Sequence, residues 1–265
     1  MASKRIVHIG TGPWGRNYLR TYTELPVVVS VADRDTWRSL IDDGPDGVVV
    51  CTPPAMHVEM AQYALMRGIP VLIEKPLALS HAEALLLQGY EAPILVNHLY
   101  LFSQGYAALK AAVETHAISH IETLGLGTKR HDGYSVLWDY GPHDIALALD
   151  LLDCMPDRVI AREVSTLLGP QFDIELHAAD TLVRCRIGIA EKRERKVIVT
   201  HESGESVFED RGDEVPGPLQ SAIEVFLAAI EGVPDTRLGL DFSLRILRVL
   251  EACDRSLIDG EAVAL

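Results

Sequence analysis

The first hundred residues alternate between short apolar runs and stretches with apolar residues at helical spacing. The apolar runs cover residues 4–9, 27–32, 47–51, 69–74 and 93–98. Such runs, separated by helical patterns, predict buried parallel strands in an α/β sheet. Residues 34–46 are too few for a full helix and a further strand, although 36–41 can form one or two helical turns. We therefore expect the sheet to lack a strand at this corner.

The pattern changes after residue 98. Helices are predicted at 104–114, 145–152, 219–231 and 242–257, and strands at 121–127, 158–165, 173–189 and 196–208. The later strands alternate apolar and polar residues, which is typical of an antiparallel sheet with one face in water. The predicted fold is α/β: a dinucleotide-binding Rossmann domain over 1–98, then an α+β domain over 99–265 with a mostly antiparallel open sheet. We expect the second domain to bind substrate and to mediate oligomerisation.

Composition narrows the class of protein. The chain has 265 residues, of which 48% are hydrophobic, so it can bury two modest cores. A net charge of −14 without a Lys/Arg run disfavours nucleic acid and anionic membranes as partners. The sequence predicts neither a signal peptide before the first strand nor a membrane span, so we expect a cytoplasmic location. The four cysteines lie far apart without a CxxC pair, which predicts neither a metal site nor disulfides: Cys51, Cys154, Cys185 and Cys253.

A glycine-rich turn follows the first predicted strand. Gly10 permits a tight turn, Gly12 allows a pyrophosphate to approach the backbone, and Gly15 allows close helix–strand packing. A turn that serves packing alone is the alternative. Asp33 ends the second strand, where a carboxylate binds the adenosine ribose, and Arg34 could stack on adenine or pair with a 2′-phosphate. The pattern predicts NAD and leaves NADP open.

A second candidate site follows the fourth apolar run. Lys75 stands at the carboxyl end of this strand, where ligands bind in open α/β sheets. A partly desolvated lysine there can serve as an acid–base group, and a surface Lys-Pro turn is the alternative. His57 follows the turn after the third strand, and we favour a capping or packing role for it over catalysis.

Four motifs together resemble the Gfo/Idh/MocA oxidoreductases, the glucose-fructose oxidoreductase and inositol dehydrogenase relatives, over nearly the whole chain. They are Gly10-x-Gly12-x-x-Gly15, Thr52-Pro53-Pro54-x-x-His57, Glu74-Lys75-Pro76 and Asp139-x-Gly141-x-His143. The resemblance implies NAD(P)-dependent hydride transfer between nicotinamide and a secondary alcohol or ketone of a sugar, polyol or nucleotide-sugar. It implies Lys75, Asp139 and His143 as catalytic residues and a cis Lys75–Pro76 peptide. The chain departs from this family in length, because it is shorter after Asp33 and around residues 127–138.

The spacing of Asp139 and His143 gives each a chemical role. They share one helix face if the helix begins before Asp139, or line its entry if it begins at Pro142. We assign His143 as general base in oxidation and acid in reduction, and Lys75 to the reacting oxygen as electrostatic partner or proton relay. Asp139 binds a neighbouring hydroxyl or orients His143. The alternatives are an N-cap for Asp139 and a core histidine for His143.

The remaining site predictions are two sets of residues. The cofactor set is Gly10, Thr11, Gly12, Pro13, Trp14, Gly15, Asp33, Arg34, Cys51, Thr52, Pro53, His57, Glu74 and Lys75. The substrate set is Lys75, His98, Arg130, Tyr134, Trp138, Asp139 and His143. Two other functions stay open: a non-catalytic regulator that senses the cofactor, and a glycosidase that uses tightly held NAD. A sheet face without its own helices predicts a homodimer or homotetramer.

Overall fold

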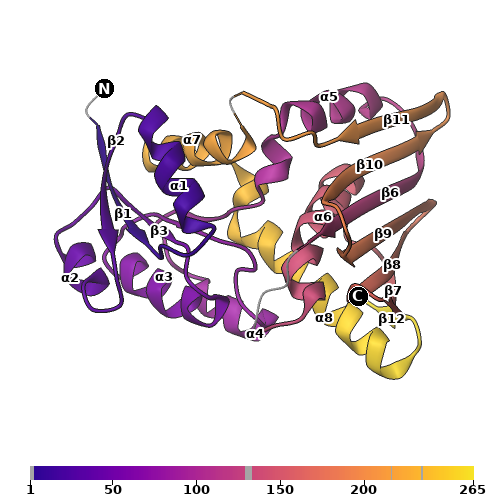
Figure 1. Cartoon of the computed structure of the whole chain (residues 1–265), viewed down its shortest axis with the longest axis horizontal. Coiled ribbons are helices and arrows are strands. Elements are labelled where there is room, and N and C mark those ends of the chain that lie inside the picture. The colour runs from indigo at the N-terminus through magenta and orange to yellow at the C-terminus, as the bar shows by residue number, and fades with distance from the viewer. Residues whose placement is uncertain (1–2, 129–132, 216, 234) are drawn as a thin grey trace. The chain divides into compact units, whose positions relative to one another are not determined.

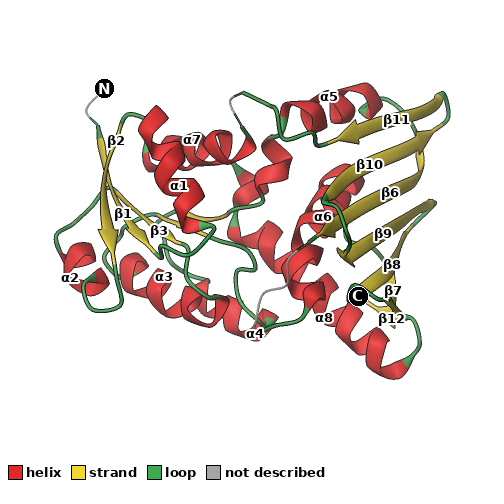
Figure 2. Ribbon diagram, viewed as in Figure 1, coloured by secondary structure: helices red, strands yellow, loops and turns green. Residues whose placement is uncertain are grey.

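The computed structural model describes residues 3–128, 133–215, 217–233 and 235–265 (Figure 1). Two compact units divide the chain. The first consists of Met1–Leu99 with Pro218–Leu244, and the second of Tyr100–Gly217 with Arg245–Leu265. Both units are α and β, and each has its own sheet (Figure 2).

The first unit contains a five-stranded, all-parallel sheet in the order β2-β1-β3-β4-β5. Its strands are β1 Lys4–Ile9, β2 Val27–Ala32, β3 Gly47–Val50, β4 Val71–Ile73 and β5 Ile94–Val96. The three strands β3, β4 and β5 are buried at every position, as expected for strands covered on both faces. The predicted α/β class is confirmed.

The helices of this unit connect successive strands. They are α1 Gly15–Thr21, η1 Tyr22–Glu24, α2 Trp37–Asp42, η2 Pro54–Met56, α3 His57–Leu65, α4 His81–Ala84 and η3 Leu85–Leu87. The six-residue α2 leads from β2 at the sheet edge back to β3 beside β1. The sheet therefore ends at β2, as the short segment 34–46 predicts.

One helix from late in the sequence belongs to the first unit. On α7, Pro218–Ile230, the side chains of Phe226 and Ile230 pack against Gly47 of β3; a Cβ at Gly47 would lie 2.8 Å and 2.7 Å from them. The next segment, η5 Thr236–Leu238, leads to Gly239, which bridges Leu95 of β5. The sequence analysis placed all of 99–265 in the second domain, whereas 218–244 returns to the first unit. Amphipathic spacing shows that a helix buries a face, but not which sheet it buries it on.

The second unit contains a seven-stranded sheet in the order β11-β10-β6-β9-β8-β7-β12. The strands are β6 Ile118–Gly127, β7 Arg158–Ser165, β8 Pro170–Ala178, β9 Thr181–Ile189, β10 Glu194–His201, β11 Gly204–Glu209 and β12 Val263–Ala264. Only β6 and β9 pair in parallel among these described strands, which confirms the mostly antiparallel prediction.

Two predicted strands are in fact hairpins. The run 173–189 is split into β8 and β9 at residues 179–180, where Ala179 has φ +46°, and the run 196–208 is split into β10 and β11 at 202–203. The turn at 179–180 carries neither Gly nor Pro, so the apolar alternation continues across it in the sequence.

The helices of the second unit are η4 Leu99–Phe102, α5 Gln104–Val113, α6 Val136–Leu152 and most of α8 Leu240–Asp259. The long α6 packs on β6, β8 and β9, whose inward residues are apolar and buried. The other face carries ion pairs between strands, such as Arg186 to Asp173 at 2.7 Å and Arg184 to Glu175 at 3.4 Å. Within the described residues, no helix combines the length and the apolar character that crossing a membrane requires.

Candidate active site

The glycine turn between β1 and α1 is tightly packed on one side and open on the other. Gly10 has φ +108°, and a Cβ there would lie 2.2 Å from the Cys51 carbonyl oxygen. A Cβ on Gly15 would lie 2.1 Å from the Gly10 carbonyl oxygen. By contrast, no heavy atom of the described chain lies within 4 Å of a Cβ at Gly12. The turn therefore needs Gly10 and Gly15 for its own packing. Gly12 leaves space for a dinucleotide pyrophosphate to approach the backbone.

A buried histidine that the sequence analysis missed forms a hydrogen bond with the backbone of this turn. His8 is fully buried, with Nε2 2.8 Å from the Gly10 carbonyl oxygen and Nδ1 3.1 Å from the Tyr22 hydroxyl. A carbonyl only accepts, so Nε2 donates to Gly10 and Nδ1 accepts from Tyr22. Burial lowers the pKa of His8 to about 4, so the ring is neutral at pH 7. The available signal was a histidine within an apolar strand next to the glycine turn.

Asp33 directly follows β2, as predicted, and stabilises the turn that follows it. Its Oδ1 accepts hydrogen bonds from the Thr36 hydroxyl at 2.7 Å and from the backbone N–H groups of Thr36 and Asp35 at 2.9 and 3.0 Å. The hydrogen bond from the Thr36 hydroxyl, aided by the backbone donors, lowers the pKa of Asp33. Asp33 and Arg34 are both exposed. Their contacts with ribose or adenine stay predictions.

The carboxylate of Glu74 is turned into the fold. Its Oε1 accepts hydrogen bonds from Trp14 Nε1 at 2.7 Å, the Tyr18 hydroxyl at 2.6 Å and Asn97 Nδ2 at 2.6 Å. Its Oε2 accepts from the Lys75 backbone N–H at 3.2 Å. Burial and the Glu74 charge raise the pKa of Tyr18 well above its usual value, so the hydroxyl remains a donor. This network joins the glycine turn, through Trp14, to the backbone of Lys75.

His57 links two turns at the same edge of the sheet. It is the first residue of α3, and its Nε2 lies 2.8 Å from the Thr52 carbonyl oxygen while Nδ1 lies 3.0 Å from that of Pro76. Burial lowers the pKa of His57 to about 4. The histidine thus takes the packing role that the sequence analysis favoured. The Lys75–Pro76 peptide is cis, as the resemblance implies.

His98 is buried close to Lys75. Its Nε2 lies 3.1 Å from the Ser243 hydroxyl, and its ring packs perpendicular to Phe242 with centroids 5.9 Å apart. Burial, with a smaller effect from the positive charge of Lys75, lowers the pKa of His98 to about 3. Lys75 therefore lies within electrostatic reach of His98. Lys75 also interacts electrostatically with Cys51, and burial raises the pKa of the Cys51 thiol.

Asp139 and His143 lie on α6 in the second unit. The helix begins at Val136, and the Ser135 hydroxyl caps it by accepting a hydrogen bond from the Trp138 N–H at 3.4 Å. The helix thus begins before Asp139, so Asp139 and His143 share a face. The N-cap alternative for Asp139 is wrong. Asp139 is buried, whereas His143 is half-buried and packs perpendicular to the Tyr100 ring.

The other predicted substrate residues differ in placement. Trp138 is buried, and its Nε1 donates to Asp254 Oδ2 on α8 at 2.7 Å, so this indole packs within the second unit. Tyr134 is half-buried just before α6. Arg130 lies outside the described residues. Among the residues that the structure does describe, no group of three or more His, Cys, Asp or Glu side chains could hold a metal ion.

The fold and the glycine turn define a dinucleotide-binding Rossmann protein with a second, α+β unit. A family model described as "Oxidoreductase family, NAD-binding Rossmann fold" matches residues 24–92. Inositol 2-dehydrogenase 1 of Saccharopolyspora erythraea is 30% identical over 142 residues, which cover 43% of this chain and 42% of that protein. Inositol 2-dehydrogenase 2 of the same organism is 29% identical over 179 residues, covering 54% and 52%. The chain thus spans about half of these relatives' length or less.

Solved structures match almost the whole length of the chain. A protein from Magnetospirillum magnetotacticum with an oxidoreductase description matches with TM-score 0.79 and 26% identity, covering 95% of this chain and 99% of that one. A myo-inositol dehydrogenase from Lactobacillus casei, solved with NAD(H) and myo-inositol, shares the fold with TM-score 0.83 and 17% identity, covering 99% and 97%. By these comparisons the chain is similar to the Gfo/Idh/MocA oxidoreductases. The packed turn with open space at Gly12 fits a dinucleotide such as the NAD that the description of the family model names.

Proposed function

We propose that this chain is an NAD-dependent dehydrogenase or reductase of a secondary alcohol or ketone on a polyol, sugar or nucleotide-sugar. The observation that carries the proposal is the pairing of Asp139 and His143 on one face of α6, in a chain whose other unit has the dinucleotide turn. Bound NAD supplies the hydride acceptor. The inositol 2-dehydrogenase names of the curated relatives favour a cyclic polyol among these substrates.

The proposed residues act on the hydroxyl proton and on the oxygen that carries it. In the oxidation direction, His143 takes the hydroxyl proton as the hydride leaves the same carbon, and in reduction it returns the proton. The Lys75 ammonium stabilises the developing negative charge on the reacting oxygen or relays its proton. Asp139 accepts a hydrogen bond from a neighbouring hydroxyl or orients the imidazole. Glu74 positions Lys75 by accepting its backbone N–H.

Charge at the adenosine end supports NAD over NADP. Asp33 has a lowered pKa and is therefore a carboxylate at neutral pH, which repels a 2′-phosphate. Arg34 follows Asp33 directly, so its positive charge could offset this repulsion of the 2′-phosphate. NAD is accordingly the proposed cofactor.

A substrate screen tests the proposal. The purified protein is incubated with inositols, sugars, their phosphates and nucleotide-sugars, each with NAD or NADP, and the absorbance of the reduced nicotinamide is followed. We expect reduction of NAD with at least one polyol. Binding of NAD without turnover of any substrate would favour the regulator, and release of a leaving group without net NADH would favour the glycosidase.

The outer face of the second sheet supports a homo-oligomer, either a dimer or a tetramer. On this face the half-buried Ile198 lies in register with Val207, which is 53% exposed. Strand β6 separates this pair from the ion-paired Arg184 and Arg186 of β9. A sheet face of mixed apolar and paired charged groups suits contact with a second copy of the same face. Light scattering at micromolar concentration should give at least twice the 29.1 kDa chain mass. A monomeric mass would refute this.

A further inference from the structure

The imidazole of His143 packs against the ring of Tyr100. Tyr100 of η4 lies with its ring centroid 4.9 Å from that of His143, at an interplanar angle of 82°. Perpendicular packing of two rings is a favoured geometry, and it restricts the rotation of both. What holds Tyr100 therefore bears on the orientation of His143.

Two arginines, one just before β10 and one on it, contact Tyr100. The guanidinium of Arg195 on β10 lies 4.6 Å from the Tyr100 ring centroid, close enough for a cation–π contact. Just before β10, Arg193 Nη2 donates a hydrogen bond to the Tyr100 hydroxyl at 2.9 Å and is ion-paired with Asp210. Both arginines therefore contact the same tyrosine, Arg195 at the ring and Arg193 at the hydroxyl.

Arg195 is fixed in turn by the residue next to His143. It is buried and forms an ion pair with the buried Asp144 of α6. Gly125 of β6 makes room for this pair, because a Cβ there would lie 2.0 Å from Asp144 Oδ2 and 2.9 Å from Arg195 Nη1. The contacts form a closed ring: His143, Tyr100, Arg195 and Asp144, with the first and last adjacent in sequence.

We propose that Tyr100 is a positioning residue for His143. Its ring, held by Arg195 and Arg193, limits the imidazole to the orientation in which it exchanges a proton with the substrate. The inference rests on the proposed role of His143 as acid and base, but the packing itself is independent of that role. Because the ring and not the hydroxyl contacts His143, an aromatic replacement should preserve most of the effect.

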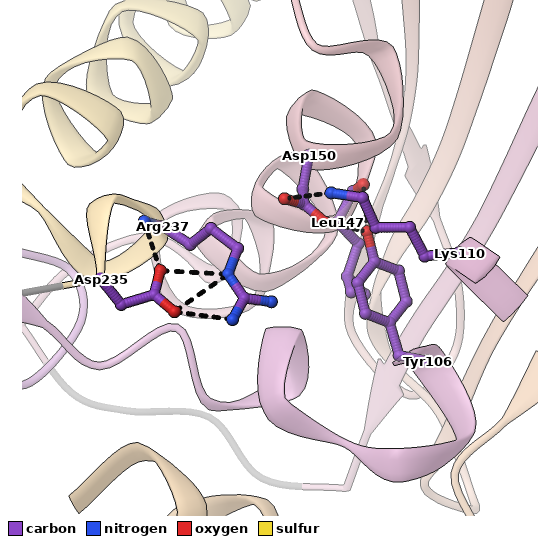
Figure 3. A network of polar contacts seen from close by, with 6 residues as sticks. All are labelled: Tyr106, Lys110, Leu147, Asp150, Asp235 and Arg237. Atoms are coloured by element: carbon purple, nitrogen blue, oxygen red, sulfur yellow. Dashed lines mark hydrogen bonds and ion pairs between the residues drawn. The ribbon is translucent and has the colours of Figure 1, made fainter. Parts of the chain in front are cut away.

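Three variants test this. Tyr100→Leu removes the ring, Tyr100→Phe keeps it, and Tyr106→Phe is the matched control. Figure 3 shows why the control is suitable: the Tyr106 hydroxyl bonds Asp150 at 2.7 Å and Leu147, beside the Lys110–Asp150 ion pair, so it reports the loss of a buried tyrosine hydroxyl elsewhere in the same unit. We expect kcat to fall about 2- to 10-fold in Tyr100→Leu, the range of one perpendicular ring contact, with an unchanged KM for NAD. Tyr100→Phe and Tyr106→Phe should stay within about 2-fold of wild type.

The second readout is the imidazole itself. NMR spectra of protein with labelled histidine, without cofactor, should show the His143 ring resonances shifted in Tyr100→Leu, near wild type in Tyr100→Phe, and unmoved in Tyr106→Phe. Assignment uses His143→Asn. If Tyr100→Leu does not fold, Tyr100→Met replaces it, because this longer side chain fills more of the space of the ring while still removing it, and it should move the same resonances.

The outcomes separate this inference from the proposed function. Unchanged His143 resonances and an unchanged kcat in a folded Tyr100→Leu protein would overturn the inference, and so would the same result in Tyr100→Met if that variant has to serve instead. Full turnover in His143→Asn would overturn the proposed role of His143, whatever the spectra of the Tyr100 variants show.

Discussion

The polar groups of the first unit and those of α6 in the second unit are held in place in different ways. In the first unit the conspicuous polar side chains bond the protein's own backbone and turns: His8 to Gly10, His57 to Thr52, and Asp33 to Thr36. On α6, one helix places Asp139 and His143 on one face, and the Tyr100 ring packs against His143. A turn must satisfy its own backbone, whereas a helix satisfies its backbone internally and leaves its side chains for other tasks.

The largest expected effect comes from removing the proposed acid–base groups. Lys75→Met keeps the apolar stem and deletes the charge, so turnover should fall by about 10² or more, with NAD affinity nearly unchanged. His143→Asn should do the same. If both act on one proton transfer, the double variant should lose far less than the product of the single losses. Steady-state kinetics and NAD titration measure these quantities.

Full turnover in a folded Lys75→Met protein would leave Glu74-Lys75-Pro76 as a structural turn. A useful control is Lys110→Met, which removes an ion-paired lysine on α5 of the second unit and should leave kcat unchanged. The loss of stability should be small, because Lys110 is partly exposed and the buried Asp150 keeps its hydrogen bond from the Tyr106 hydroxyl.

The glycine turn offers a sharper contrast between a role in folding and a role in binding. Gly10→Ala places a Cβ 2.2 Å from the Cys51 carbonyl oxygen at φ +108°, so we expect a loss of about 1–3 kcal/mol in the free energy of unfolding. Gly12→Ala meets no described atom within 4 Å, so stability should stay within about 0.5 kcal/mol while NAD affinity falls. Urea unfolding and NAD titration separate the two. Equal stability losses in both variants would contradict this division.

The buried histidines of the first unit predict acid sensitivity. His8 has a pKa of about 4 in the fold and an ordinary value near 6.5 in the unfolded chain. Between these values the unfolded state binds the extra proton, so stability falls as the pH drops from 6.5 to 4, by up to about 3 kcal/mol for a shift of this size. His57 contributes in the same direction.

Urea unfolding at pH 7 and at pH 5 measures this loss. His8→Gln is neutral at both values, so its stability should change less between them than that of wild type. An identical change in the two proteins would show that His8 is not the source.

Sequence reasoning succeeded where one local pattern determines one element. The strands Lys4–Ile9 and Val27–Ala32 have their predicted bounds, and the missing strand follows from the length of 34–46. It failed where the partner is distant. The spacing of α7 could not show that Phe226 packs on Gly47, and nothing near Glu74 in the sequence points to Asn97 as its donor. The ring that holds His143 joins residues 100, 143, 144 and 195, so only the folded chain reveals it.

The smallest expected effect concerns the choice of cofactor, and it tests whether a side chain that stabilises its own turn also selects a ligand. Asp33→Ser removes the carboxylate but leaves a hydroxyl that can still accept from the Thr36 N–H, so the turn should persist. The ratio of kcat/KM for NADP to that for NAD should rise about 10-fold, the effect of removing one nearby like charge from the 2′-phosphate.

Asp35→Ser is the matched control. Asp35 is an exposed acid in the same turn, and its backbone N–H, not its carboxylate, forms the hydrogen bond with Asp33. A wild-type protein that already prefers NADP by a wide margin would mean that Arg34 outweighs Asp33. An equal shift in both variants would mean that the net charge of the turn, and not the position of Asp33, sets the preference.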